Sequence, residues 1–148
     1  MVIFKTNFGD IKIELDFDKA PKTAENFKQY VEEGFYDGTI FHRVIDGFMA
    51  QTGDPTGTGT GRSSKPNLTA EFSGEKHVRG TCAVARSANP DSANSQFFIC
   101  FDAAPWLDGQ YTVWGQVSEG MDVIDQLAKG EPPRNPDKIV SMKVAADA

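Results

Sequence analysis

The sequence predicts a mostly β protein, a closed antiparallel barrel with two capping α-helices. Two observations support this fold class. At least seven short apolar or alternating segments are bounded by turn residues, a pattern typical of β-strands. Only two segments carry apolar residues at helical spacing. So many strands beside so few helices favour antiparallel pairing over a parallel α/β sheet.

The N-terminal part is predicted to be a hairpin followed by a helix. Val2–Thr6 and residues 11–15 are the strands, and residues 7–10 form the turn between them. The helix begins at Pro21, because proline suits a first helical turn, and Gly34 ends it. Apolar side chains recur at helical spacing between these two residues: Ala24, Phe27, Tyr30 and Val31.

A second hairpin is predicted around Asp46 and Gly47. Aspartate and glycine tolerate the positive φ that a two-residue hairpin turn requires. Arg43 precedes this turn, and Met49 and Gln51, which share one strand face, follow it. An arginine in so apolar a segment needs a partner, and we expect Gln51 to be that partner. The hairpin therefore places a fixed positive charge beside apolar surface.

Four further strands and one short helix complete the predicted fold. The strands are residues 81–85, 96–101, 112–117 and 139–145. The helix covers residues 121–127 and ends before Gly130, Pro132 and Pro133. Because the sequence has neither an internal repeat nor a linker, we expect residues 1–148 to form a single domain.

Composition and charge argue against several classes of protein. The chain is 39% hydrophobic and 24% charged, and no apolar stretch has the length of a membrane helix. The N-terminus reads as a strand rather than a secretory signal, so we expect a cytoplasmic protein. A net charge of −6 disfavours nucleic-acid binding, which depends on clustered lysine and arginine.

Other chemistries find little support in the motifs. In the glycine-rich residues 53–66, Gly61-Arg62-Ser63 lacks the lysine that a phosphate-binding P-loop has after its last glycine. The histidines and cysteines lack metal-ligand spacing, and the sequence contains no nucleophile elbow. We expect His42 to be structural and His77 to be solvated or bonded to a loop. Cys82 and Cys100 are expected to be buried and reduced, with a disulfide as the alternative if their strands pair.

Two blocks of the sequence combine aromatic, amide and guanidinium side chains. The first block is Phe41-His42-Arg43 followed by Gly47-Phe48-Met49 and Gln51; the second is Gln96-Phe97-Phe98-Ile99 followed by Trp106-Leu107-Asp108-Gly109. With these motifs the sequence resembles the cyclophilin family of peptidyl-prolyl isomerases. These motifs occur in the family's order, and the resemblance extends from the N-terminal strand to about Val117. It implies an eight-stranded barrel and catalysis of cis-trans isomerisation at X-Pro peptide bonds in polypeptides, which assists protein folding.

The resemblance also implies a set of site residues. Arg43, Gln51 and Phe48 correspond to the catalytic arginine, the glutamine that holds it, and a wall of the proline pocket. Alternation along a strand sends Phe97 and Phe98 to opposite faces, and the resemblance assigns Phe98 to the groove. The implied substrate-binding residues are Met49, Ala85, Arg86, Gln96, Phe98, Trp106, Leu107 and Tyr111.

Some of these positions differ from the family pattern. Arg86 replaces an asparagine common in eukaryotic members and is expected to alter sequence preference more than rate. Tyr111 replaces a histidine, and Thr52 replaces a glycine. Residues 53–66 and 87–94 are implied to border the groove. These features resemble the shorter prokaryotic members.

The resemblance implies that the partners are proline-containing peptides and unfolded or flexible protein segments. Trp106 is implied to bind a cyclosporin-type macrocycle. We expect a monomer that requires no cofactor or metal and binds neither nucleic acid nor membrane. A non-catalytic module that docks proline-containing peptides in the same groove is the competing hypothesis.

Overall fold

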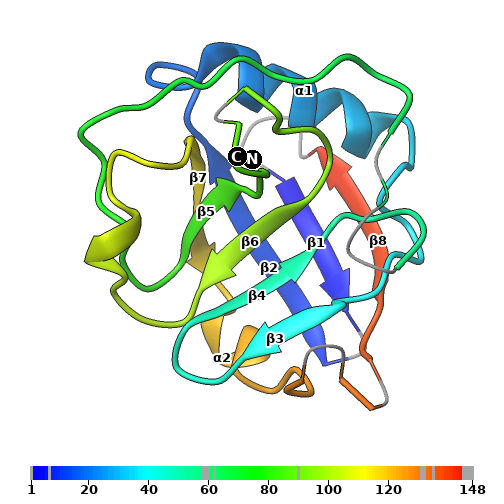
Figure 1. The fold of residues 1–148 in the computed structure, drawn as a ribbon. Helices are drawn as coiled ribbons and strands as arrows, with labels where there is room; N and C mark the ends of the chain where they lie inside the picture. The colour runs from blue at the N-terminus through cyan, green and yellow to red at the C-terminus, as the bar shows by residue number, and fades with distance from the viewer. Residues whose placement is uncertain are drawn as a thin grey trace.

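The computed structural model describes residues 2–6, 8–57, 61, 63–89, 91–130, 133–134 and 136–144. Eight antiparallel strands form one sheet in the order β3-β4-β6-β5-β7-β2-β1-β8. The strands are β1 (Val2–Thr6), β2 (Gly9–Leu15), β3 (Arg43–Ile45), β4 (Met49–Thr52), β5 (Thr81–Val84), β6 (Phe97–Cys100), β7 (Val113–Glu119) and β8 (Ile139–Val144). The sheet curls, with helix α1 (Pro21–Glu32) at one end and α2 (Met121–Ile124) at the other (Figure 1).

The barrel is less closed than the sequence predicts. In the described part of the chain β3 and β8 form no ladder with each other, so they remain the edges of the sheet. The outer edge of β3 instead pairs with one residue of a loop. Val44 and Gly130 exchange two backbone hydrogen bonds of 2.8 Å each. This contact gives hydrogen-bond partners to the N–H and C=O of Val44, the central residue of a strand that is only three residues long.

Most predicted elements are confirmed to within two residues, and the differences have local causes. Helix α2 ends at Ile124 rather than at residue 127. The N–H groups of Gln126 and Leu127 donate to carbonyls three residues earlier instead of four, which is the pattern of a 3₁₀ turn. Ile45 pairs with Met49, so three residues rather than two connect β3 and β4. The 3₁₀ helix η1 (Pro105–Leu107) was not predicted. Predictions on residues 7, 58–60, 62, 90, 132 and 145 lie outside the described residues.

The interior is divided into two apolar clusters by strand alternation. The main core lies under α1, where the rings of Phe27 and Trp114 stack 3.9 Å apart and Phe97 packs edge-on against both. The pocket-side cluster lies on the opposite face of the same strands and comprises Met49, Ala83, Phe98, Cys100, Ala104, Leu107 and Val113. The predicted division of Phe97 and Phe98 between two faces is confirmed.

The two cysteines are buried and are not joined by a disulfide. Cys82 packs in the main core and Cys100 in the pocket-side cluster, so the sheet separates the two sulfurs. Burial raises the pKa of the Cys82 thiol well above its usual range. Burial, with a smaller contribution from Asp108, raises the pKa of Cys100 to about 12.

We therefore expect both thiols to resist a thiol reagent at neutral pH, because the thiolate is the reactive form and neither sulfur is exposed. The measurement is the labelling rate of the native protein, with full labelling of two thiols in urea as the control. Rapid native labelling of either cysteine would contradict this assignment.

None of the helices in the described residues is long and apolar enough to cross a membrane.

Candidate active site

A pocket of about 120 Å³ lies on the sheet face opposite the main core. Its lining combines an apolar wall with two guanidinium groups and one amide. The lining residues are Arg43, Phe48, Met49, Gln51, Ala85, Arg86, Phe98, Leu107 and Tyr111. The structure thus brings together nine of the eleven residues that the sequence singles out. Gln96 and Trp106 are the two that do not line the pocket.

Strand register explains why distant residues meet here. Arg43 of β3 lies opposite Gln51 of β4, and Gln51 lies opposite Phe98 of β6. These three side chains form one row across three strands, and they share a face because directly paired residues point the same way. The antiparallel ladder therefore places a charge, an amide and an aromatic ring side by side.

A chain of amide contacts orients the polar end of this row. The Gln96 Nε2 donates to the Gly61 carbonyl at 3.1 Å, and the Gln51 Nε2 donates to Gln96 Oε1 at 2.9 Å. The Gln51 amide oxygen is then directed to Arg43, whose Nη1 donates to it at 3.4 Å. The predicted partnership of Arg43 and Gln51 is confirmed, with Gln96 behind it as a positioning residue.

The surroundings of Arg43 differ from the expectation. The sequence suggests an arginine enclosed by apolar residues, but the side chain is exposed at the pocket edge. Alternation explains the difference, because the apolar neighbour Val44 points to the main core. Arg43 can therefore contact a ligand in the pocket while its charge stays partly hydrated.

The apolar wall is buried and closely packed on the side of β6. Phe98 and Leu107 are only 5% and 8% exposed, and the Phe98 ring meets Tyr111 edge-on at 5.5 Å. Met49 is 2% exposed and packs in the same cluster. Such a wall removes water from one side of a ligand, which strengthens hydrogen bonds made on the other side.

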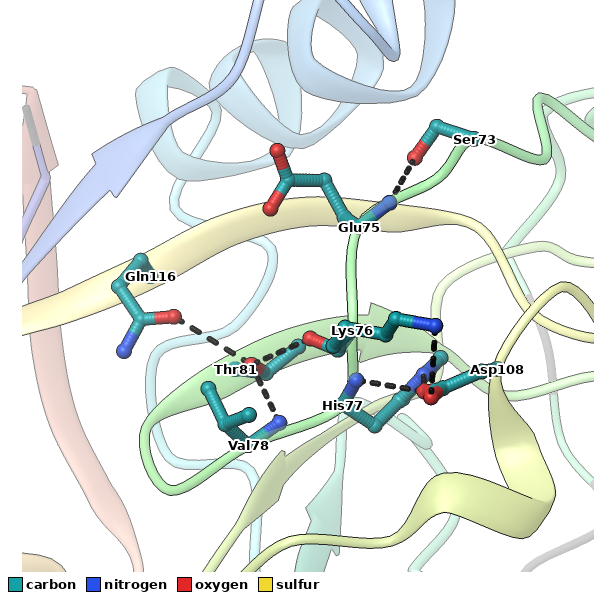
Figure 2. Close-up of polar contacts among 8 residues, drawn as sticks. All are labelled: Ser73, Glu75, Lys76, His77, Val78, Thr81, Asp108 and Gln116. Atoms are coloured by element: carbon teal, nitrogen blue, oxygen red, sulfur yellow. Dashed lines mark hydrogen bonds and ion pairs between the residues drawn. The ribbon is translucent and has the colours of Figure 1, made fainter.

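A histidine and an aspartate behind this wall were missed as site residues. His77 is 1% exposed, so its predicted solvated role is wrong, whereas the predicted bond to a loop is confirmed. Asp108 accepts the His77 backbone N–H at 2.7 Å and lies 3.0 Å from its Nδ1 (Figure 2). The His77 ring lies 6.1 Å from Phe98 and is nearly parallel to it. This pair supports the wall from behind.

The pair also fixes the segment that carries Leu107. Asp108 directly follows Leu107, and the Ala104 N–H donates to the His77 carbonyl at 2.9 Å. Hydrogen bonds from the backbone and ring of His77 lower the pKa of the Asp108 carboxyl. On the other side of the loop, Thr81 Oγ1 accepts the Val78 N–H at 3.0 Å (Figure 2). The Trp-Leu-Asp-Gly block was the sequence signal that could have drawn attention to Asp108.

The other histidine plays no direct part in the pocket. His42 is 6% exposed and does not line the cavity. Burial lowers its pKa below the usual value, which favours the neutral ring. This placement agrees with the predicted structural role.

Comparison with known proteins identifies the family. The family model described as cyclophilin type peptidyl-prolyl cis-trans isomerase/CLD matches residues 1–144. The chain belongs to the cyclophilin family. A probable peptidyl-prolyl cis-trans isomerase of Brucella suis biovar 1 (strain 1330) is 51% identical over 162 residues, which cover 99% of this chain and 83% of the relative. A peptidyl-prolyl cis-trans isomerase of Acinetobacter baylyi is 43% identical over 97% of this chain and 85% of its own length.

Solved cyclophilins share the fold of this chain. A Cryptosporidium parvum cyclophilin crystallised in the presence of the dipeptide Ala-Pro superimposes with a TM-score of 0.91 at 32% identity, covering 99% of both chains. A cyclophilin from Hirschia baltica gives the same TM-score at 30% identity, covering 99% of this chain and 74% of its own. The present chain, like the relatives it matches, is a peptidyl-prolyl cis-trans isomerase.

Trp106 lies at the outer edge of the site in this cyclophilin. It belongs to η1, is 63% exposed and contacts the Phe48 ring at a centroid distance of 5.6 Å. Since it does not line the 120 Å³ pocket, only a ligand that extends beyond the pocket can reach it.

Proposed function

We propose that this isomerase acts without covalent chemistry, by stabilising the twisted X-Pro amide between Arg43 and an apolar pocket that holds the proline ring. One observation carries the proposal: the pocket pairs a guanidinium that Gln51 orients with a buried apolar wall. Among its described lining residues are no cysteine, histidine, aspartate or glutamate that could serve as a nucleophile or proton carrier.

The mechanism follows from the electronic structure of the amide. Rotation about the bond meets a barrier of about 18–20 kcal/mol, because resonance gives the C–N bond partial double-bond character. In the twisted state the proline nitrogen becomes pyramidal and regains its lone pair. A guanidinium N–H that donates to this nitrogen binds the twisted state better than either planar state. Lowering the barrier by about 7 kcal/mol would accelerate isomerisation about 10⁵-fold.

Each group at the pocket has one part in this mechanism. Arg43 donates to the proline nitrogen, and Gln51 orients Arg43 and reaches the substrate backbone. The proline ring packs against Phe48 and Phe98, and the rest of the lining, namely Met49, Leu107 and Tyr111, completes its enclosure. Ala85 and Arg86 border the chain that carries the proline.

The substrates that fit this site are proline-containing peptides and flexible protein segments. Isomerisation swings the chain on one side of the bond, so a proline locked in a folded core is not a substrate. The Ala-Pro dipeptide used with the Cryptosporidium parvum cyclophilin supports this class. A single domain over residues 1–148, a cytoplasmic location and a monomeric state stay predictions.

Exchange NMR on the peptide Ala-Ala-Pro-Phe tests the proposal, because it reports binding and cis-trans exchange in one sample. We expect catalytic amounts of protein to broaden and merge the cis and trans signals. The same peptide with proline replaced by alanine is the control and should bind weakly. Binding without accelerated exchange would favour the peptide-docking module.

Trp106→Phe is expected to weaken binding of a cyclosporin-type macrocycle by about fivefold while leaving peptide isomerisation nearly unchanged. Phenylalanine keeps the ring contact with Phe48 but lacks the indole N–H donor, and a lost hydrogen bond costs on the order of 1 kcal/mol. Titration calorimetry with cyclosporin A measures the affinity. Equal affinity in parent and variant would refute a donor role for Trp106.

A further inference from the structure

Two cavities of this acidic protein have linings of opposite charge. The larger cavity, about 430 Å³, is lined by Glu14, Asp16, Asp18 and Glu75 and has no lysine or arginine among its described lining residues. The isomerase pocket has the opposite character. Its described lining contains Arg43 and Arg86 and no carboxylate, although the chain carries a net charge of −6.

Arg86 is held in place by neutral groups. Its Nε donates to the Gln110 carbonyl at 2.8 Å and its Nη1 to the Ser87 carbonyl at 2.9 Å. The guanidinium also lies over the Tyr111 ring, with 4.8 Å between its carbon and the ring centroid. Within the residues that the structure describes, these hydrogen bonds all go to backbone carbonyls, so no bonded carboxylate neutralises the charge.

This arrangement presents an ordered positive charge to whatever occupies the pocket. Arginine normally loses side-chain entropy when it binds an anion, but Arg86 is already fixed by two hydrogen bonds and a ring contact. Its Nη2 edge remains for a carboxylate, which guanidinium groups bind with good geometry. Tyr111, which Arg86 covers, itself lines the pocket.

We propose that Arg86 makes this isomerase select X-Pro segments that carry an acidic side chain next to the proline. The inference rests on the proposed function, since it places the substrate in the same pocket. The other carboxylates of this acidic protein oppose such a preference, because they repel an acidic peptide. At an ionic strength of 0.15 M the Debye length is about 8 Å, so these distant charges are screened more than a contact inside the pocket.

The test compares peptides that differ by one side chain. Two series, Ala-Xaa-Pro-Phe and Ala-Ala-Pro-Xaa, carry glutamate, glutamine or lysine at Xaa, and exchange NMR at 0.15 M salt gives kcat/KM for each. In at least one series we expect the glutamate peptide to exceed the lysine peptide by about fivefold, the size that a partly exposed ion pair and the matching repulsion produce together.

Variants assign this preference to Arg86. Arg86→Gln should reduce the glutamate-to-lysine ratio to about twofold or less, and Arg86→Lys should keep more of it, because the charge remains. Lys12→Gln removes the same charge from a residue that lines neither cavity, so it should leave the ratio unchanged. The glutamine peptide is the uncharged reference: each protein's rates with the glutamate and lysine peptides are divided by its rate with the glutamine peptide, so a general loss of activity in Arg86→Gln does not change the comparison.

The outcomes separate this inference from the proposed function. A parent enzyme without the glutamate preference in either series, or a ratio that Arg86→Gln leaves unchanged, overturns the inference. Absent exchange with every peptide overturns the proposed function instead. If Arg86→Gln is poorly folded, Arg86→Met, which removes the charge with an unbranched side chain, gives the same comparison.

Discussion

Arg43→Ala is expected to lower kcat/KM for X-Pro isomerisation by about 10²- to 10³-fold, while peptide affinity falls only a few-fold. The reason is that the guanidinium acts mainly on the twisted amide, whereas the ring contacts that hold the planar substrate remain. Because the Arg43 side chain is exposed, its removal leaves no cavity in either apolar cluster. Exchange NMR on Ala-Ala-Pro-Phe measures both quantities.

Two further variants sharpen the Arg43 result. Arg43→Lys should also be slow, because lysine keeps the charge but lacks the planar fork that can bind Gln51 and substrate together. Arg79→Ala is the matched control, since Arg79 pairs with Asp125 and does not line the pocket. Undiminished exchange in a folded Arg43→Ala protein would refute the mechanism.

Phe98→Ala should have the second largest effect, and it should act on binding and on stability together. Phe98 is 5% exposed and belongs to both the pocket lining and the pocket-side cluster. Removing a buried phenylalanine ring costs about 3–5 kcal/mol of unfolding free energy. The missing wall should also weaken peptide binding by more than tenfold, because the ring supplies apolar contact worth on the order of 1.5–3 kcal/mol.

The neighbouring residue provides the control for Phe98. Phe97 is fully buried in the main core, so Phe97→Ala should lose comparable stability in urea unfolding. At a temperature where both variants are folded, Phe97→Ala should bind Ala-Ala-Pro-Phe much more tightly than Phe98→Ala. Equal affinities for the two variants would show that Phe98 is not a wall of the binding site.

Local sequence patterns predicted the parts of the site that depend on strand periodicity. Alternation placed Phe97 and Phe98 on opposite faces, and the residues Asp46 and Gly47 located the turn between β3 and β4, although the connection is one residue longer than predicted. Helix α1 followed from its apolar spacing and from Pro21 at its start. These features need only the neighbouring residues, which is why a single sequence was sufficient.

Features that depend on distant contacts could not be derived in this way. His77 lies among polar residues in an irregular segment, and only the approach of Asp108 reveals that it is buried. The bond from Gln96 to the Gly61 carbonyl joins two loops whose sequences carry no sign of the contact. The backbone pairing of Val44 with Gly130 likewise joins β3 to a loop distant in the sequence, and neither segment carries a sign of this contact.

Because β1 pairs with β8, the sheet can be completed only after the C-terminal strand has been synthesised. Val2 lies opposite Val144, so the first strand must wait for the last before the sheet is complete. At roughly 5–20 residues per second, ribosomal synthesis would leave one edge of β1 open for many seconds. Contacts so distant in sequence also slow folding after release. This peptidyl-prolyl isomerase therefore has a late, long-range step in its own folding.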